Sequence, residues 1–306
     1  MGSRSERVLI TGGAGFTGRP LAERLRRDGH EVITLGHGGG NDCDLNVDLC
    51  NLDAATEALG RSRPTAIVHL AGIAAPTHSK VGEMYSANVV GTANLFAALA
   101  NAKLEPRIVI VASSGQLYAV PDTEGLLTED APLGPKTHYA VSKRATEDIA
   151  AIYSRQFRII VTRPFNYTGP GQTTNFLVPK IVQHYADQRS EIRLGNLDLF
   201  RDFSDVERVI EAYSRLVSQP IAPTTVNICS GRAMHLADIL AMMDEISGHP
   251  LCRVSDPSLF RADEARFLVG SPSRLEALVG PLPNPGFRDT LVRMYDASLK
   301  QRGAAA

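Results

Sequence analysis

The sequence predicts an α/β fold with a doubly wound parallel sheet and a smaller mixed α/β cap. Two observations lead to this fold. Continuous apolar, β-branched runs of strand length alternate with longer segments of helical length, which is typical of βαβ units whose strands are buried on both faces. A glycine-rich turn, TGGAGFTG at 11–18, directly follows the first apolar run and opens the first helical segment.

The order of the elements follows from this alternation. Strands are expected at 7–11, 31–35, 66–72, 107–114 and 158–166, with a short additional strand in NVDL. Helices are expected between them, at 15–28, 53–61, 80–102 and 138–156. Because each strand is followed by a helix, the strands are expected to run parallel in one sheet.

The sequence changes in character after residue 166. Loops rich in Pro and Gly appear, followed by a helix at 176–188, a strand in IRLGN, a loop RDFSDV that leads into a helix, and a strand in TTVNICS. We expect two domains with interleaved boundaries. They are a dinucleotide-binding domain at 1–165 and 200–233, and a substrate-binding cap at 166–199 and 234–306.

Composition restricts the class of protein. The 306 residues are 43% hydrophobic, enough for a large core, and 32 Lys and Arg balance 33 Asp and Glu. No overall field therefore attracts nucleic acid or an anionic membrane, and a small molecule is the expected partner. The four cysteines show no CxxC or metal-binding spacing, and the start MGSRSERVLI does not read as a signal peptide. These features predict reduced thiols, a cytoplasmic location and no metal site.

The glycine-rich turn is the predicted pyrophosphate site. Gly12, Gly15 and Gly18 allow the backbone to turn tightly and to approach a pyrophosphate, whose charge would face the N-terminus of the first helix. Phe16 and Thr17 lie in the same turn and are expected to contact the cofactor. Glycine-rich turns also occur as plain strand-to-helix connections, but the position at the first βα turn favours dinucleotide binding.

The remaining cofactor contacts are expected at the ends of other strands. The second strand ends in LGHGGG, without the acid that would accept from the ribose of NAD. NADP is therefore open as well as NAD, with Arg19 and His37 as candidate phosphate partners or simply solvated residues. Further candidates line the adenine pocket or pass close to the middle of the cofactor: Asp48, Leu49, Leu70, Ala71 and Gly72.

Three residues form a predicted proton-transfer site. Tyr139 and Lys143 in THYAVSK lie four positions apart on one helix face, and Ser114 ends a predicted strand. A free tyrosine has a pKa of about 10, and an adjacent ammonium favours the phenolate. A YxxxK spacing alone usually marks an exposed helix, but here it follows a cofactor turn and a serine at a strand's carboxyl end. The combination favours catalysis.

At this point the sequence resembles a known family, the extended short-chain dehydrogenase/reductases that act on nucleotide sugars. The matching motifs span nearly the whole chain: TGGAGFTG, HLAG, NVVGTANL, SSGQLY, YAVSK and RPFNYTGPGQ. The resemblance implies a Rossmann fold, NAD or NADP as cofactor, and Ser114, Tyr139 and Lys143 as catalytic triad, with Lys143 also holding the nicotinamide ribose. It also implies a homodimer through the helices at 80–102 and 138–156, whose apolar positions could equally be buried against the sheet.

The cap segments narrow the implied substrate. LGNLDLFRDFSDV, NFLVPK and FRADEARFLVGS resemble the branch of this family that acts on GDP-mannose derivatives. The resemblance implies nucleotide contacts from Asn175, Lys180, Arg201, Arg261 and Glu264. The alternative is that Arg201 and Arg261 are surface ion-pair residues. Asn166 is expected to bind a substrate phosphate or to brace the cofactor loop, or else to be a simple turn residue.

The expected reaction is reduction of the C4 keto group of a GDP-4-keto-6-deoxyhexose to a GDP-6-deoxy sugar such as GDP-rhamnose. The 4,6-dehydratases of the family carry an acidic pair where this chain has Gly115 and Gln116, so dehydration is disfavoured. A nucleotide-sugar C4 epimerase with tightly held NAD is the nearest alternative. A non-catalytic dinucleotide sensor is a further one, although all three triad residues are present.

Overall fold

A computed structural model describes residues 5–37, 42–74, 80–119, 124–260 and 265–305 of the chain. Its centre is a seven-stranded parallel sheet in the order β10-β6-β5-β4-β1-β2-β3. The strands are β1 (Arg7–Thr11), β2 (Glu31–Gly36), β3 (Leu45–Asn46), β4 (Ala66–His69), β5 (Ile108–Ala112), β6 (Ile159–Pro164) and β10 (Thr224–Ile228). The chain order reverses between β1 and β4, and doubly wound sheets bind ligands beside this switch point. The predicted sheet is confirmed.

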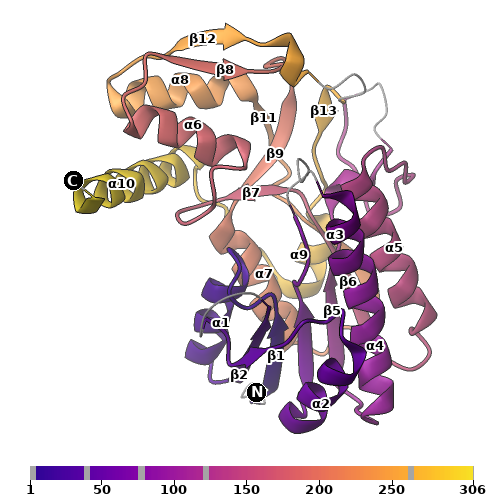
Figure 1. The fold of residues 1–306 in the computed structure, drawn as a ribbon. Coiled ribbons are helices and arrows are strands. Elements are labelled where there is room, and N and C mark those ends of the chain that lie inside the picture. The colour runs from indigo at the N-terminus through magenta and orange to yellow at the C-terminus, as the bar shows by residue number, and fades with distance from the viewer. Residues whose placement is uncertain (1–4, 38–41, 75–79, 120–123, 261–264, 306) are drawn as a thin grey trace.

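Helices cover both faces of this sheet. The helices of one face are α1 (Gly18–Arg27), α7 (Val206–Ser218) and α9 (Ser273–Val279), and those of the other are α2 (Leu52–Ser62), α4 (Gly91–Asn101) and α5 (His138–Ile152) (Figure 1). Successive side chains of a strand point to opposite faces, so Val8 and Ile10 of β1 join one core cluster and Leu9 the other. This two-sided burial explains the continuous apolar runs of the sequence.

The helix expected over 80–102 contains a break in its regular geometry. It consists of α3 (Val81–Tyr85), a π-helical turn (Ser86–Val90) and α4. π-Helical turns inside helices are rare and are frequent at functional sites. This one contains Asn88, a buried polar residue.

Several segments that follow β6 build a second, smaller layered unit at one end of the sheet, whereas α7, β10 and α9 belong to the main sheet layer (Figure 1). The strands of the smaller unit are β7 (Asn166–Thr168), β9 (Phe200–Asp205), β11 (Ala233–His235) and β13 (Phe267–Leu268) in one sheet, and β8 (Glu191–Leu194) with β12 (Cys252–Ser255) in another. Its helices are α6 (Leu177–Ala186), α8 (Leu236–Ser247) and α10 (Phe287–Ala305), and it has an apolar core of its own. The predicted domain boundaries stay a prediction. Across the described ranges, no helix combines the length and apolarity needed to cross a membrane.

The segment RDFSDV, expected to be a loop, instead forms most of β9. The expectation is wrong because the buried side chains of this strand are polar. Asp202 accepts hydrogen bonds at 2.8 Å from Ser230 N, Ser230 Oγ and Gly231 N. Hydrogen bonds replace apolar contacts here, so the apolar pattern that identifies strands is absent.

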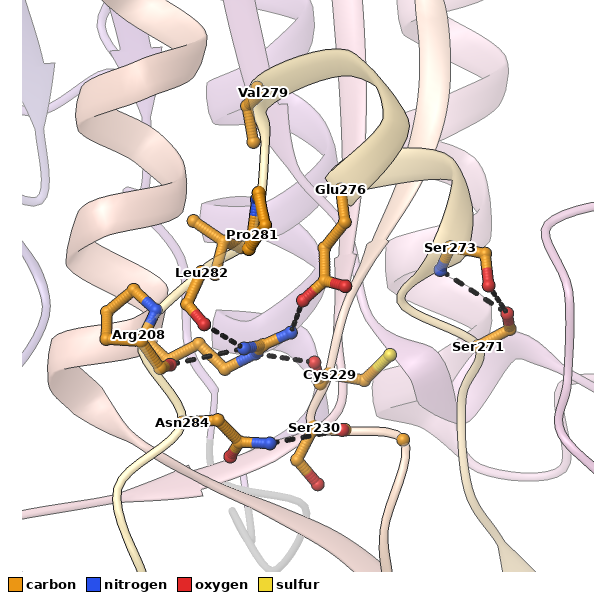
Figure 2. A network of polar contacts seen from close by, with 12 residues as sticks. Arg208, Cys229, Ser230, Ser271, Ser273, Glu276, Val279, Pro281, Leu282 and Asn284 are labelled. Atoms are coloured by element: carbon orange, nitrogen blue, oxygen red, sulfur yellow. Dashed lines mark hydrogen bonds and ion pairs between the residues drawn. The ribbon is translucent and has the colours of Figure 1, made fainter.

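A fully buried guanidinium joins α7 to the chain that follows α9. Arg208 Nε donates to the Cys229 carbonyl at 2.7 Å, and its Nη1 donates to the carbonyls of Leu282 and Pro283 at 3.1 Å each (Figure 2). Its Nη2 pairs with the Glu276 carboxylate at 2.7 Å. Removing one side of a buried pair leaves the other polar groups without a partner, and this cost exceeds what the pair itself stabilises.

We therefore predict that Arg208→Met lowers the free energy of unfolding by about 3–5 kcal/mol in urea denaturation. Arg215→Met is a matched control, because Arg215 lies on the same helix and reaches the same segment through the Val279 and Pro281 carbonyls, with a partly exposed side chain. Its loss should cost about 1 kcal/mol. Equal losses in the free energy of unfolding for the two variants would contradict the larger stabilising contribution of the buried Arg208.

Candidate active site

The turn between β1 and α1 lies against the end of β4. Gly12 has a φ of 71°, and a Cβ at this position would lie 2.9 Å from the Ala71 nitrogen. A Cβ at Gly18 would lie 2.2 Å from the Gly12 carbonyl oxygen. Gly15, in contrast, is exposed, and its Cβ would meet only that carbonyl at 3.1 Å. Two glycines thus allow the tight turn, and the third leaves room for a ligand to approach the backbone.

The first turn of α1 fits an anion. Thr17 is the N-cap residue, but its hydroxyl makes no capping bond and instead lies 2.8 Å from the Tyr167 hydroxyl. The ring of Phe16 stacks on the Tyr167 ring with centroids 6.0 Å apart. A helix N-terminus without a capping side chain offers its N–H groups to phosphate oxygens. The predicted cofactor residues of this turn therefore form a cradle that fits a pyrophosphate.

The predicted adenosine side of the cofactor site lies at the ends of β2 and β3. His37 Nε2 lies 3.8 Å from Asp48 Oδ2, and both side chains are largely exposed. Leu49 is buried, whereas Arg19 is exposed on α1. The Asp48 carboxylate can accept a hydrogen bond from a ribose hydroxyl, and an N–H of His37 can donate one to a phosphate. This arrangement favours neither NAD nor NADP.

The end of β4 lies between the predicted cofactor turn and the predicted catalytic residues. The amide groups of Leu70 and Ala71 each donate to the last residue of β1 at 3.1 Å. Gly72 follows with a φ of 155°, and a Cβ there would lie 2.6 Å from Asn88 Oδ1 and 3.5 Å from Lys143 Nζ. A side chain at this position would displace Asn88 Oδ1 and would contact Lys143 Nζ.

The structure brings the three predicted catalytic residues to the carboxyl end of β5. Ser114 follows that strand, and Tyr139 and Lys143 lie on the first turns of α5, whose N-cap Thr137 accepts from Ala140 N at 3.1 Å. Lys143 Nζ donates to the Ala112 carbonyl at 2.9 Å, and the Tyr139 phenol hydrogen-bonds Ser114. All three triad residues are buried.

Burial shifts both titrating groups of the triad toward their neutral forms. It raises the pKa of Tyr139 to about 12, with the Ser114 hydrogen bond opposing this shift and Tyr167 adding to it. Burial lowers the pKa of Lys143 to about 8, with Glu147 opposing. The predicted lowering of the Tyr139 pKa by Lys143 is wrong, because desolvation outweighs the interactions of the phenol. Tyr139 thus keeps its proton at neutral pH and is suited to act as an acid.

A polar network that the sequence analysis missed supports this site. Asn88 Oδ1 accepts from Ile73 N at 2.7 Å, and its Nδ2 donates to Ser142 Oγ at 2.9 Å, next to Lys143. His69 is buried, and desolvation and the Lys143 ammonium lower its pKa to about 3, so it is neutral. The available signal was the asparagine that opens the largely apolar helical stretch NVVGTANL.

Two predicted substrate contacts lie on neighbouring strands of the cap. Asn166 Nδ2 on β7 donates to the Asp202 carbonyl at 3.2 Å, which brings it beside Arg201 on β9. Arg201 is buried, and its Nη1 donates to the Arg266 carbonyl at 3.3 Å. The alternative of a surface ion-pair residue therefore does not fit Arg201, and Asn166 braces two strands.

The other predicted substrate contacts are more dispersed. Lys180 on α6 directs its Nζ to the Arg193 carbonyl of β8 at 3.4 Å. Asn175 is exposed in the turn before α6. Arg261 and Glu264 lie outside the described residues.

A cavity of about 250 Å³ opens at the end of β8, the strand that Lys180 contacts. Its lining residues are Leu194, Gly195, Asn196, Leu197, Arg253, Val254, Ser255 and Phe260. Phe260 is an exposed aromatic side chain, a type that stacks well on a nucleobase. The sequence analysis missed these residues, although LGNLDLF and FRADEARFLVGS both contribute to the cavity wall.

A second cavity of about 360 Å³ lies on the outer side of α5, near β10. Its charged lining residues pair with one another, Arg144 with Asp148 and Arg163 with Glu147, so we assign no ligand to it. Among the residues with described positions, no group of three or more His, Cys, Asp or Glu side chains is placed to hold a metal ion.

Comparison with known proteins places this site in context. Residues 8–229 match the sequence profile of the NAD dependent epimerase/dehydratase family. The GDP-6-deoxy-D-talose 4-dehydrogenase of Aggregatibacter actinomycetemcomitans is 34% identical over 90% of this chain and 91% of its own length. The GDP-6-deoxy-D-mannose reductase of Pseudomonas aeruginosa is 29% identical over 94% of this chain and 95% of its own.

Two solved structures share the whole architecture. A putative epimerase from Burkholderia cenocepacia J2315 is 40% identical, with a TM-score of 0.89 over 98% of this chain and 100% of its own. The structure of RMD from Pseudomonas aeruginosa complexed with NADPH is 28% identical, with a TM-score of 0.85 over 98% and 100% of the two chains.

The buried ammonium predicts an unusual stability effect. Lys143→Met should raise the free energy of unfolding near pH 7 by about 1–3 kcal/mol, because the variant removes a desolvated charge. The pKa is about 8 in the folded chain against an ordinary 10.5, so the penalty is full below the folded pKa and vanishes above the ordinary one. Urea denaturation at several pH values should show the advantage of the variant shrinking across that interval.

Lys300→Met, at an exposed position of α10, is the control and should change the free energy of unfolding by less than about 0.5 kcal/mol. A Lys143→Met variant less stable than the wild type near pH 7, or an advantage independent of pH, would contradict this account of the ammonium.

Proposed function

The chain belongs to the NAD-dependent epimerase/dehydratase family, and we propose that it reduces the C4 keto group of a GDP-4-keto-6-deoxyhexose with NADH or NADPH. One observation carries the proposal. Tyr139 holds its proton at neutral pH and hydrogen-bonds Ser114 at the carboxyl end of β5, beside the switch point of the sheet. A reductase needs a proton donor at this place, because the ketone oxygen becomes an alkoxide during hydride transfer.

The chain contributes the proton and the binding groups of the reaction. The glycine turn at 12–18, the end of β4 and Lys143 would hold the dinucleotide, which supplies the hydride when bound. Ser114 donates a hydrogen bond to the C4 oxygen, and Tyr139 gives its proton to that oxygen as negative charge develops there. Burial of both groups excludes water that would compete for the same oxygen.

Lys143 acts through its charge. Its pKa of about 8 leaves the ammonium predominantly charged at neutral pH. This charge stabilises the phenolate that remains after Tyr139 has given up its proton, and it can bind the hydroxyls of the nicotinamide ribose. Burial favours the neutral form of Lys143. The hydrogen bond to the Ala112 carbonyl and the charge of Glu147 oppose this effect.

The surroundings of Ser114 support reduction rather than dehydration. A Cβ at Gly115 would lie 2.8 Å from the ring of Phe165, so this position has no room for the acidic side chain that eliminates water. Gln116 cannot exchange protons near neutrality. Hydride transfer to a ketone needs neither group.

Three features support a GDP sugar. Two relatives are named for GDP-6-deoxy sugars, one a 4-dehydrogenase and one a reductase. The cavity near β8 offers Phe260 for a base, and Lys180 and Arg201 lie in the same cap for the diphosphate. The product is a GDP-6-deoxy sugar such as GDP-rhamnose. Talose and mannose differ at C4, so the ring face presented to the hydride determines which of them forms.

A nucleotide-sugar C4 epimerase with tightly held NAD is a second candidate. The specific observation in its favour is the 40% identity to the Burkholderia cenocepacia chain described as a putative epimerase. An epimerase takes hydride from C4 and returns it to the other face, so its cofactor is not consumed. Consumption of cofactor therefore separates the two candidates.

We also propose a homodimer in the cytoplasm. Val90, beside α4, and Val141, on α5, are apolar and exposed, whereas Leu95 and Phe96 are buried against the sheet. The exposed positions fit a helix-to-helix contact between two copies. The cysteines are free thiols, which suits a reducing compartment.

Wild-type protein should oxidise one NADH or NADPH for each GDP-4-keto-6-deoxyhexose that it reduces. Tyr139→Phe should lower kcat by about a hundred- to ten-thousand-fold, because the proton donor is lost. Tyr153→Phe, at the C-terminal end of α5, is the control and should keep wild-type turnover. Absence of cofactor oxidation with every such substrate contradicts the reductase, and a co-purifying cofactor that is never consumed would support the epimerase.

The pH profile should report Lys143. Its ammonium is present below its pKa of about 8 and lost above it, so kcat/KM for the reduced cofactor should fall as pH rises through that value. Tyr139, with a pKa of about 12, should cause no further change of kcat/KM with pH near neutrality. A kcat/KM that rises with pH through this region is incompatible with the proposed role of the ammonium.

A further inference from the structure

One hydroxyl pair connects the cofactor turn to the cap. Thr17 Oγ1 and the Tyr167 hydroxyl are 2.8 Å apart although the residues are 150 positions apart in sequence. The Phe16 and Tyr167 rings lie 16° from parallel with centroids 6.0 Å apart, which adds an apolar contact at the same place. We call this pair of hydroxyls the Thr17–Tyr167 latch.

The latch uses the Thr17 hydroxyl, which would otherwise cap the N-terminus of α1. A threonine at an N-cap usually accepts from an N–H of the first helical turn, and α1 receives no such bond from Thr17. The hydroxyl is instead bonded to the cap, at the turn that fits a pyrophosphate. A ligand that fixes the backbone of this turn therefore also fixes the Thr17 hydroxyl, to which Tyr167 is hydrogen-bonded.

The other end of the latch, Tyr167, lies on β7, close to residues that we propose bind the substrate. Side chains alternate along β7, so Tyr167 points to the cofactor turn while Asn166 points the other way and donates to the Asp202 carbonyl. β7 pairs with β9 in a register that sets Tyr167 opposite Ser204. Asn166 and Arg201, both proposed to bind the nucleotide sugar, therefore share a small sheet with Tyr167.

We propose that the Thr17–Tyr167 latch couples the two binding sites, so that the dinucleotide in its cradle increases the affinity of the cap for the nucleotide diphosphate. This inference rests on the proposed function. When two ligands order the same structural element, binding of the first lowers the conformational entropy cost of binding the second. This lower cost produces positive coupling. Coupling is reciprocal, so the nucleotide diphosphate must increase the affinity for the dinucleotide by the same factor. Tyr167 is a positioning residue in this scheme.

Calorimetric titration of GDP in the absence and presence of saturating NADPH measures the coupling without turnover. Wild-type protein should bind GDP at least about fivefold more tightly with NADPH present. Tyr167→Phe keeps the ring and its stacking on Phe16, and Thr17→Val keeps the shape of the threonine, but each removes the hydroxyl bond. Both variants and the double variant should show less than about a twofold effect.

Tyr213→Phe is the matched control. Its hydroxyl lies 2.9 Å from Thr162 Oγ1, a buried tyrosine–threonine pair of the main sheet domain, so its hydrogen bond goes to β6 and not to the turn or to β7. This variant should keep the wild-type coupling. Loss of coupling in Tyr213→Phe would assign the effect to general loosening of the core and overturn the latch.

The remaining outcomes separate the latch from the proposed function. Coupling that persists in Tyr167→Phe overturns the latch, and so does a much larger loss in Tyr167→Phe than in Thr17→Val, since the tyrosine would then act on a ligand directly. Wild-type protein that binds both ligands without coupling also overturns the latch alone. Wild-type protein that binds neither NADPH nor NADH contradicts the proposed function itself, and the latch falls with it.

Discussion

Burial of a phenol and an ammonium on one face of α5 is the constraint around which the rest of this molecule is organised. Desolvation works against the charged form of each group, and it raises the pKa of Tyr139 while lowering that of Lys143. The pair remains usable because the polar contacts of each group are supplied by the same strand end, from Ala112 and Ser114. A protonated phenol and a charged but easily neutralised ammonium at neutral pH suit an enzyme that donates a proton to a reduced carbonyl.

The neighbouring backbone is shaped to fit this pair. Gly72 lies close to Lys143 and leaves space for Asn88 Oδ1, and the π-helical turn presents Asn88 to the loop after β4 and to α5. Neutral His69 avoids a second cation beside the ammonium. On the cap side, Tyr167 and the cofactor turn meet directly, so the two halves of the proposed site are joined by a specific contact in addition to the chain connections.

The sequence predicted the local features well and the long-range ones poorly. The strands of the parallel sheet, the glycine turn and the positions of Ser114, Tyr139 and Lys143 depend on short-range patterns. The structure contains the expected sheet, with the turn and the three side chains at the carboxyl ends of its strands. β9 was missed because its buried residues are polar, and no periodicity reveals a carboxylate such as Asp202 satisfied from a distant loop. The direction of the Tyr139 pKa shift was wrong because spacing reports a neighbouring charge but not the depth of burial. Tyr167, Asn88 and Phe260 acquire their roles only from contacts across the fold.

The central claim is that Lys143 is buried beside the phenol with a depressed pKa, and direct titration of the lysine side chains tests it most closely. In an NMR titration of protein labelled at the lysine Cε positions, one resonance should titrate with a pKa of about 8, and this resonance should be absent from the spectrum of Lys143→Met. If every lysine, including the one missing from the variant, titrates at the ordinary value of 10.5, the ammonium is solvated and this account of the site is contradicted.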